Sequence, residues 1–152
     1  PAGATGPTGA TEPLNLLSAF STPPQAAAPA TAFIFDRNTV DYGTAITHAN
    51  NSSDFVIQEP GVYLVLFNGT ISPVPNASFP VSTLIYLTQD GTPVVGSAVR
   101  YSFQNAQEVA NQSFTQPITV TSVPAILQLV SELGTLLYSD VSLTILRLAD
   151  VP

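Results

Sequence analysis

The fold class of this chain is decided by the segment Gly61-Val-Tyr-Leu-Val-Leu-Phe-Asn-Gly-Thr-Ile71. Successive side chains of a β-strand point to opposite faces, so one face of this segment carries Tyr63, Val65, Phe67, Gly69 and Ile71. A wholly apolar row of this kind is what the inside of a β-sandwich requires. The opposite face would be polar if it met solvent, yet it is mostly aliphatic and carries Val62, Leu64, Leu66, Asn68 and Thr70.

The last long apolar segment, residues 141–148, repeats this arrangement. Val141, Leu143 and Ile145 form one apolar side of the expected strand. Two interpretations of the second side are open: a face hidden by another subunit, or a central part of a sheet that loops of the same chain cover. The first interpretation predicts an interface between subunits formed by Val62, Leu64, Leu66, Asn68, Ser142, Thr144, Leu146 and Leu148.

The rest of the chain after residue 31 also has the pattern of β-strands. Apolar and β-branched segments bounded by Gly, Pro, Asn or Asp occupy residues 32–35, 55–57, 62–71, 81–88, 94–103, 108–120, 125–130 and 136–148. Asp90-Gly91 between two of them is a strong hairpin signal, because these residues tolerate the positive φ angles of a tight turn. The sequence therefore predicts an all-β protein, a sandwich or jelly roll.

The first residues have a different pattern. Gly3, Gly6 and Gly9 are spaced by three, which is the Gly-X-Y register that a collagen triple helix demands, since only Gly fits at its crowded axis. The alternative is a flexible Gly/Pro/Thr linker. We expect a collagen-like stub over residues 1–11, a Pro- and Ala-rich extended neck over 12–30, and a trimerising head over 31–152.

Composition restricts the class of partner. Charged residues make up 9% of the chain and hydrophobic residues 45%, so the apolar surface exceeds what a lone monomer usually carries. The net charge is −7 with only three cationic side chains, all Arg, which excludes nucleic acid as a partner. No apolar run is long enough to cross a bilayer, so we expect no membrane insertion.

Catalytic groups are scarce. The only His, His48, lies in a polar stretch that reads as a surface loop without a nucleophile turn. Two pairs of carboxylates can be considered, Asp36 with Asp41 and Asp54 with Glu59. We interpret them as solvated turn residues. Oxygen ligands in residues 36–41 suit calcium, but Arg37 among them argues against a site. We expect no enzyme, no cofactor and no bound metal.

Three segments together resemble a known family. They are Gly61-Val-Tyr-Leu-Val-Leu-Phe67, Ile85-Tyr-Leu-Thr-Gln-Asp-Gly-Thr-Pro-Val-Val-Gly-Ser97 and Val141-Ser-Leu-Thr-Ile-Leu-Arg-Leu148. Their order is similar to that in the C-terminal domains of collagen-like glycoproteins on the exosporium, the outermost layer of bacterial spores. The resemblance implies a ten-stranded jelly roll like those of tumour necrosis factor and the complement heads. It further implies an extracellular homotrimer that nucleates the collagen stalk of a spore or cell-surface filament.

The same resemblance implies O-glycosylation at Thr5, Thr8 and Thr11, the third positions of the triplets. Two other functions remain open. One is an adhesin head that binds a host receptor or a glycan, with Tyr42, Phe79 and Tyr101 as the aromatic residues to examine. The other is the tip of a viral or phage fibre with a collagen-like shaft.

Overall fold

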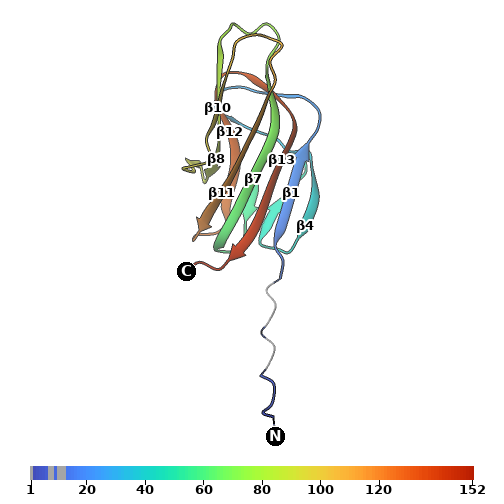
Figure 1. Cartoon of the computed structure of the whole chain (residues 1–152), viewed down its shortest axis with the longest axis vertical. Coiled ribbons are helices and arrows are strands. Elements are labelled where there is room, and N and C mark those ends of the chain that lie inside the picture. The colour runs from blue at the N-terminus through green and yellow to red at the C-terminus, as the bar shows by residue number, and fades with distance from the viewer. Residues whose placement is uncertain (1, 7–8, 10–12) are drawn as a thin grey trace.

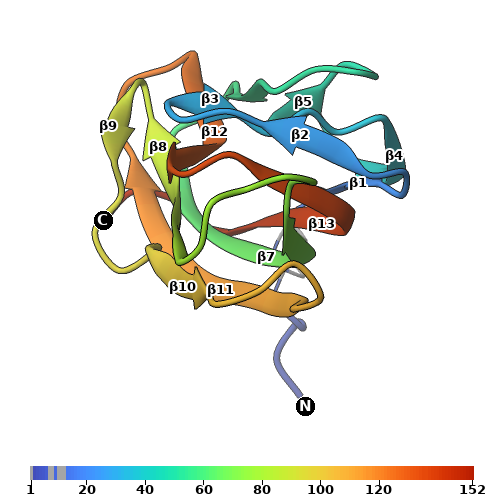
Figure 2. The same cartoon turned by 90° about the horizontal axis from the view of Figure 1, so that it is seen from above.

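The chain folds into two β-sheets that face each other, as Figure 2 shows from above. The structure is a computed structural model, and it describes residues 2–6, 9 and 13–152. No helix occurs in the described part of the chain. The prediction of an all-β sandwich is confirmed.

Sheet A contains the three longest strands of the protein, β7, β11 and β13. Its members are β1 (Leu16–Ser21), β2 (Gln25–Ala27), β4 (Arg37–Tyr42), β7 (Gly61–Pro73), β11 (Ala110–Val120) and β13 (Leu136–Ala149). The strand order is β11-β7-β13-β1-β4, and β2 pairs with the early part of β13. Figure 1 looks onto this sheet.

Sheet B is built mostly from shorter strands. Its members are β3 (Thr31–Ala32), β5 (Ile46–His48), β6 (Phe55–Ile57), β8 (Val81–Gln89), β9 (Thr92–Pro93), β10 (Val99–Phe103) and β12 (Ala125–Leu133). The strand order is β10-β8-β12-β6-β5, with β3 beside β12 and β9 beside β8. Each sheet thus has a continuous path of five strands, and the short strands β2, β3 and β9 pair outside these paths.

The core lies between the sheets and follows the expected alternation. Tyr63, Val65 and Ile71 of β7 are fully buried, and so are Leu143 and Ile145 of β13. Aromatic side chains fill much of the remaining space between the layers. The rings of Phe33 and Tyr138 stack with their centroids 4.1 Å apart. The predicted inner faces of these two strands are therefore confirmed.

The segment expected to be an extended neck belongs largely to sheet A instead. β1 lies between β13 and β4, and Leu17 and Ala19 are fully buried in the core. The prediction of a neck over residues 12–30 is wrong for β1 and β2. Alternating Leu16 to Ser21 can form a strand because no Pro interrupts it, although Pro13, Pro23 and Pro24 flank it.

Three further expectations differ from the structure. Of the expected strand over 94–103, only residues 99–103 form a strand, β10, because residues 94–98 form a loop after β9. The sequence patterns do not predict the strands β4 and β5. His48, expected in a surface loop, ends β5 and is buried, with its ring stacked on Phe55 at 4.3 Å.

Candidate oligomer interface

The face of sheet A that points away from the core carries a row of apolar side chains across four strands. Leu16 of β1 is paired with Leu146 of β13, which is paired with Leu64 of β7. Leu64 is in turn paired with Pro117 of β11. Paired residues on one face of antiparallel strands are direct neighbours, so these four side chains form one continuous apolar band.

Two rows of residues that are more polar than this band lie beside it. The first contains Ser18, Thr144, Leu66 and Thr115, and the Ser18 and Thr144 hydroxyl oxygens are 2.8 Å apart. The second contains Phe20, Ser142, Asn68 and Ser113. We call these twelve residues, together with Val62, the open face. Its polarity increases from the Leu16 row toward the Phe20 row.

The open face is not covered by the described part of the chain. Leu66 is 37% exposed and Asn68 is exposed, while Val62, Leu64, Ser142, Thr144 and Leu146 are half-buried. Leu148 is 52% exposed, close to the bulge between Arg147 and Ala149. The interpretation that loops of the same chain cover these leucines is therefore wrong for the described residues.

Seven of the eight residues predicted as interface lie together on the open face, and Leu148 lies beside it at the end of β13. Sequence reasoning missed the contribution of β1, namely Leu16, Ser18 and Phe20, because it assigned them to the neck. The sequence signal for this strand is the alternation of these residues with Leu17, Ala19 and Ser21. The structure shows that Leu17, Ala19 and Ser21 are buried. β11 was predicted as a strand, but its outward residues were not assigned to the interface.

The open face carries no charged side chain. Charged residues flank it: Arg37 of β4 is paired with Phe20 at the edge of the sheet, and the exposed Asp140 of β13 lies two residues before Ser142. Charged residues are depleted at the cores of protein interfaces, where a buried charge without a partner is costly. The lack of charge over four adjacent strands therefore suits contact with protein.

The apolar end of the open face is also the end where the N-terminal segment leaves the head (Figure 1). Leu14, just before β1, is 54% exposed, and Tyr42, paired with Leu16 at the edge of sheet A, is 59% exposed. Leu14 and Tyr42 thus extend the leucine band toward the end of the molecule where the N-terminal segment leaves.

Of the residues considered for catalysis, Asp41, His48 and Asp54 line one pocket together with Thr47 and Ser52, whereas Asp36 and Glu59 do not line it. Burial lowers the pKa of His48, an effect that its contact with the Ser52 carbonyl and the nearby Asp54 charge oppose. Asp36 accepts hydrogen bonds from the Ser21 hydroxyl and the Gln25 amide, at 2.9 and 3.2 Å. Within the described residues, no three side chains of His, Cys, Asp or Glu are grouped to hold a metal ion.

Two other expectations can be placed in the structure. Thr5 lies in the described part of the N-terminal segment, outside any strand, whereas Thr8 and Thr11 lie outside the described residues. Of the three aromatic residues considered for an adhesin, Tyr42 and Tyr101 are exposed and Phe79 packs partly against the core. Residues 2–6, 9 and 13–152 contain no helix that could span a membrane.

Comparison with known proteins gives matches at the level of structure alone. No family pattern and no curated protein matches the sequence. The globular domain of a zebrafish complement 1qA protein superposes with a TM-score of 0.64 at 12% identity, covering 90% of this chain and 99% of that one. Eiger TNF from S. frugiperda gives 0.64 at 11% identity, covering 93% and 96%.

Murine APRIL also superposes, with a TM-score of 0.63 at 10% identity over 89% of this chain and 99% of that one. At such low identity the likeness establishes the fold and nothing further. The head has the jelly-roll fold found in these complement and tumour necrosis factor structures.

Proposed function

We propose that this chain is the non-enzymatic, extracellular head of a collagen-like surface filament, and that it forms a homotrimer and nucleates the stalk. The observation that carries the proposal is the uncharged open face with its band of leucines at the end where the N-terminal segment leaves. Contact between three copies of this face would remove the leucines from water. Val62, Leu64, Leu66, Asn68, Ser142, Thr144 and Leu146, with Leu148 beside them, are the proposed interface.

The glycine spacing in the N-terminal segment supports the stalk. A Cβ atom added to Gly3, Gly6 or Gly9 would meet nothing within 4 Å, so contacts within the single described chain give no reason for Gly at these positions. A triple helix does give one, because every third residue faces its crowded axis. We therefore keep residues 1–11 as a collagen-like stub, with Thr5, Thr8 and Thr11 as proposed sites of O-linked sugar.

The mechanism is one of effective concentration. Three heads in contact would hold three stub ends close together, so that winding the stalk becomes an intramolecular step. This lowers the entropic cost of bringing the chains into register. The resemblance to exosporium glycoproteins leads us to propose the outermost spore layer, or more generally a cell surface, as the location.

The nucleation mechanism can be tested by attaching a longer Gly-X-Y stalk to the chain. Refolding of the melted stalk, followed by circular dichroism, should be faster with the natural head than with a head carrying Leu64→Glu. The matched control is Ile126→Glu on β12, an exposed apolar residue of sheet B away from the open face. Equal refolding rates for the natural and Leu64→Glu heads would contradict nucleation by the head.

A second candidate, an adhesin that binds a host receptor or a glycan, is favoured by one surface feature. Tyr101 of β10 lies in a shallow pocket with Arg100, Ser82, Thr83 and Ser102. An aromatic ring beside a cation and several hydroxyls can bind a sugar or an acidic group by stacking and hydrogen bonding. This function is compatible with the structural one, because β10 lies in sheet B. Binding to glycans that is unchanged by Tyr101→Ala would argue against it.

A further inference from the structure

We propose that Asn15 is a positioning residue that fixes the direction in which the N-terminal segment joins the head. This inference rests on the proposed function, because the segment that it directs is the proposed stalk. Asn15 lies just before β1 and is only 4% exposed, which is unusual for an Asn side chain.

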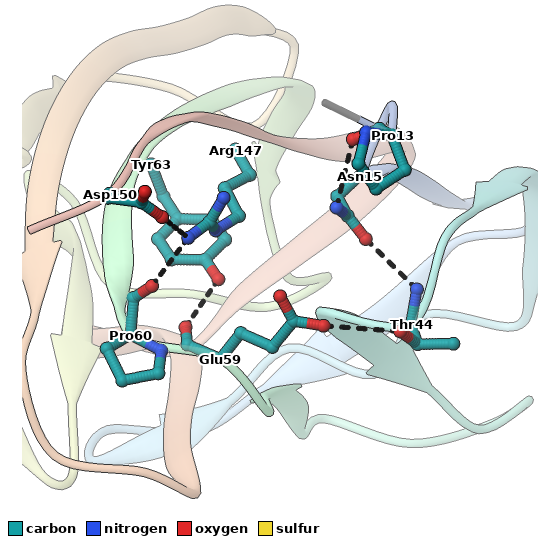
Figure 3. A network of polar contacts seen from close by, with 8 residues as sticks. All are labelled: Pro13, Asn15, Thr44, Glu59, Pro60, Tyr63, Arg147 and Asp150. Atoms are coloured by element: carbon teal, nitrogen blue, oxygen red, sulfur yellow. Dashed lines mark hydrogen bonds and ion pairs between the residues drawn. The ribbon is translucent and has the colours of Figure 1, made fainter. Parts of the chain in front are cut away.

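The side chain of Asn15 connects two parts of the chain that are distant in sequence. Its Oδ1 atom accepts hydrogen bonds from the backbone N–H groups of Thr44 and Ala45, both at 3.0 Å. Its Nδ2 atom donates to the backbone carbonyl of Pro13 at 3.2 Å. Figure 3 shows the Asn15 side chain between Pro13 and Thr44. One amide thus holds the loop before β5 with its oxygen and the incoming chain with its nitrogen.

The backbone around Asn15 is shaped to accept this side chain. Gly43, which precedes the two donors, has φ of +83°, and a Cβ atom there would collide with Asn15 Oδ1. The carbonyl of Asn15 also accepts a hydrogen bond from the N–H of Arg147 at 3.0 Å. Side chain and main chain of Asn15 are therefore both held, from β13 on one side and the loop 43–45 on the other.

The contacts continue from Asn15 to the two central strands of the open face. Thr44 Oγ1 donates to Glu59 Oε1 at 3.2 Å, and the Tyr63 hydroxyl donates to the Glu59 carbonyl at 2.6 Å. The Arg147 guanidinium donates to the Pro60 carbonyl at 2.9 Å and to Asp150 at 2.6 Å (Figure 3). The point where the chain enters is thus fixed relative to β7 and β13.

Such a fixed point matters for a stalk built from three chains. The gain in effective concentration from a trimeric head decreases when the connections to the head are loose, because each chain end then samples a larger volume. The hydrogen bond from Asn15 to the Pro13 carbonyl holds the residue just before Leu14 and β1. A small change in backbone direction at this residue alters the path of the residues that precede it. Asn15 therefore limits the volume that the three stub ends sample.

The two functions of the amide can be separated by substitution. Asn15→Asp keeps an oxygen acceptor for Thr44 and Ala45 but has no donor for the Pro13 carbonyl. Asn15→Ala removes both contacts. The chain contains no Cys, so cysteines introduced at Pro13 and at Ser122, in the exposed loop before β12, can be spin-labelled selectively. The distance between them is measured by pulsed electron paramagnetic resonance, after mixing with excess unlabelled protein so that only distances within one chain contribute.

With Asn15 present, we expect one narrow distance distribution. Both Asn15→Asp and Asn15→Ala should lose the narrow peak, and if Asn15→Ala fails to fold, Asn15→Asp still provides the test. The matched control is Asn38→Ala, which removes the bonds from Asn38 to the His48 carbonyl and ring. It should lower the midpoint of thermal unfolding and keep the narrow peak, because Asn38 does not contact Pro13.

A narrow peak in Asn15→Asp, the same as with Asn15, would overturn the inference, since the direction of the chain would then be set without the Pro13 bond. This outcome differs from failure of the proposed function. If the head does not trimerise, its mass in solution is that of one chain, whereas the distance distribution within that chain still reports on Asn15.

Discussion

Leu16 and Leu146 face each other across β1 and β13, and Leu146 is paired on its other side with Leu64 of β7. These three leucines lie far apart in the sequence, so only the folded sheet brings them together. They lie on the face away from the core, where they are half-buried. A surface of this kind gains free energy when a second protein surface covers it.

Replacing Leu64 or Leu146 with Glu should convert the proposed trimer to monomers. An ionised carboxylate without a partner in the interface costs several kcal/mol, and the threefold arrangement repeats that cost in each chain. The mass of each variant in solution checks the result. Ile126→Glu, on sheet B, should keep the mass of the natural protein; a trimeric Leu64→Glu variant would count against the open face as the interface.

Replacing Tyr138 with Phe should lower the free energy of unfolding by about 1–3 kcal/mol. The buried Tyr138 hydroxyl accepts a hydrogen bond from the Ile34 N–H at 3.0 Å and donates one to Gln25 Oε1 at 3.2 Å. Phe would leave the Ile34 N–H and the Gln25 oxygen without these partners. Urea unfolding of both proteins gives the difference, and an unchanged midpoint would show that water replaces the hydroxyl.

The stability of the head should fall as the pH falls from about 7.5 to 5.5, because of His48. Burial lowers the pKa of His48 below its ordinary value of 6.5, so the folded state favours the neutral ring more than the unfolded state does. The contribution of His48 is therefore complete above pH 6.5 and is lost as the pH decreases through 6.5 toward the lower folded pKa. Urea midpoints across this range measure the effect.

The control for this pH dependence is His48→Gln, which keeps a polar side chain but does not titrate. Its urea midpoint should change less between pH 7.5 and 5.5 than that of the natural protein. The same slope in both proteins would assign the pH dependence to other groups.

The folded head should resist trypsin at room temperature. The chain has three cleavage positions, Arg37, Arg100 and Arg147, and all three lie within paired strands. Cleavage requires an extended segment free of the sheet, so local opening must come first. Gel electrophoresis over several hours checks this expectation. Rapid loss of the intact chain would mean that the edge strands β4 or β10 open easily.

Sugar on Thr5, Thr8 and Thr11 should appear as hexose increments in the intact mass of protein isolated from its natural cells. Replacing all three residues with Ala should remove those increments. Their complete absence from the unmodified protein would eliminate these positions as glycosylation sites.

The long strands could be predicted from the sequence because their alternation is strong. β7 has one wholly apolar face, β13 has one that is apolar from Val141 to Ile145, and these faces form the core in the structure. The open face was predicted for the same reason, because a sheet face that meets solvent alternates to polar residues, whereas this one has leucines at positions 64, 66 and 146. Periodicity of apolar residues therefore carried both the fold class and most of the candidate interface.

The parts that could not be predicted depend on contacts between distant segments. β1 has only six residues, and Pro13 and Pro23 near its ends made the region read as an extended neck. His48 looked like a loop residue because its neighbours are polar, and only the folded chain supplies Phe55 and the Asn38 side chain around it. Asn15 likewise gains its contacts from residues about 30 positions away in sequence.

The central claim is that the open face joins three chains, and the most direct test is the mass of the unmodified protein by light scattering on a size-exclusion column. One chain has a mass of 15.9 kDa. We expect a particle of three times this mass that persists on dilution into the micromolar range. A particle with the mass of one chain would contradict both the trimer and the nucleation of the stalk.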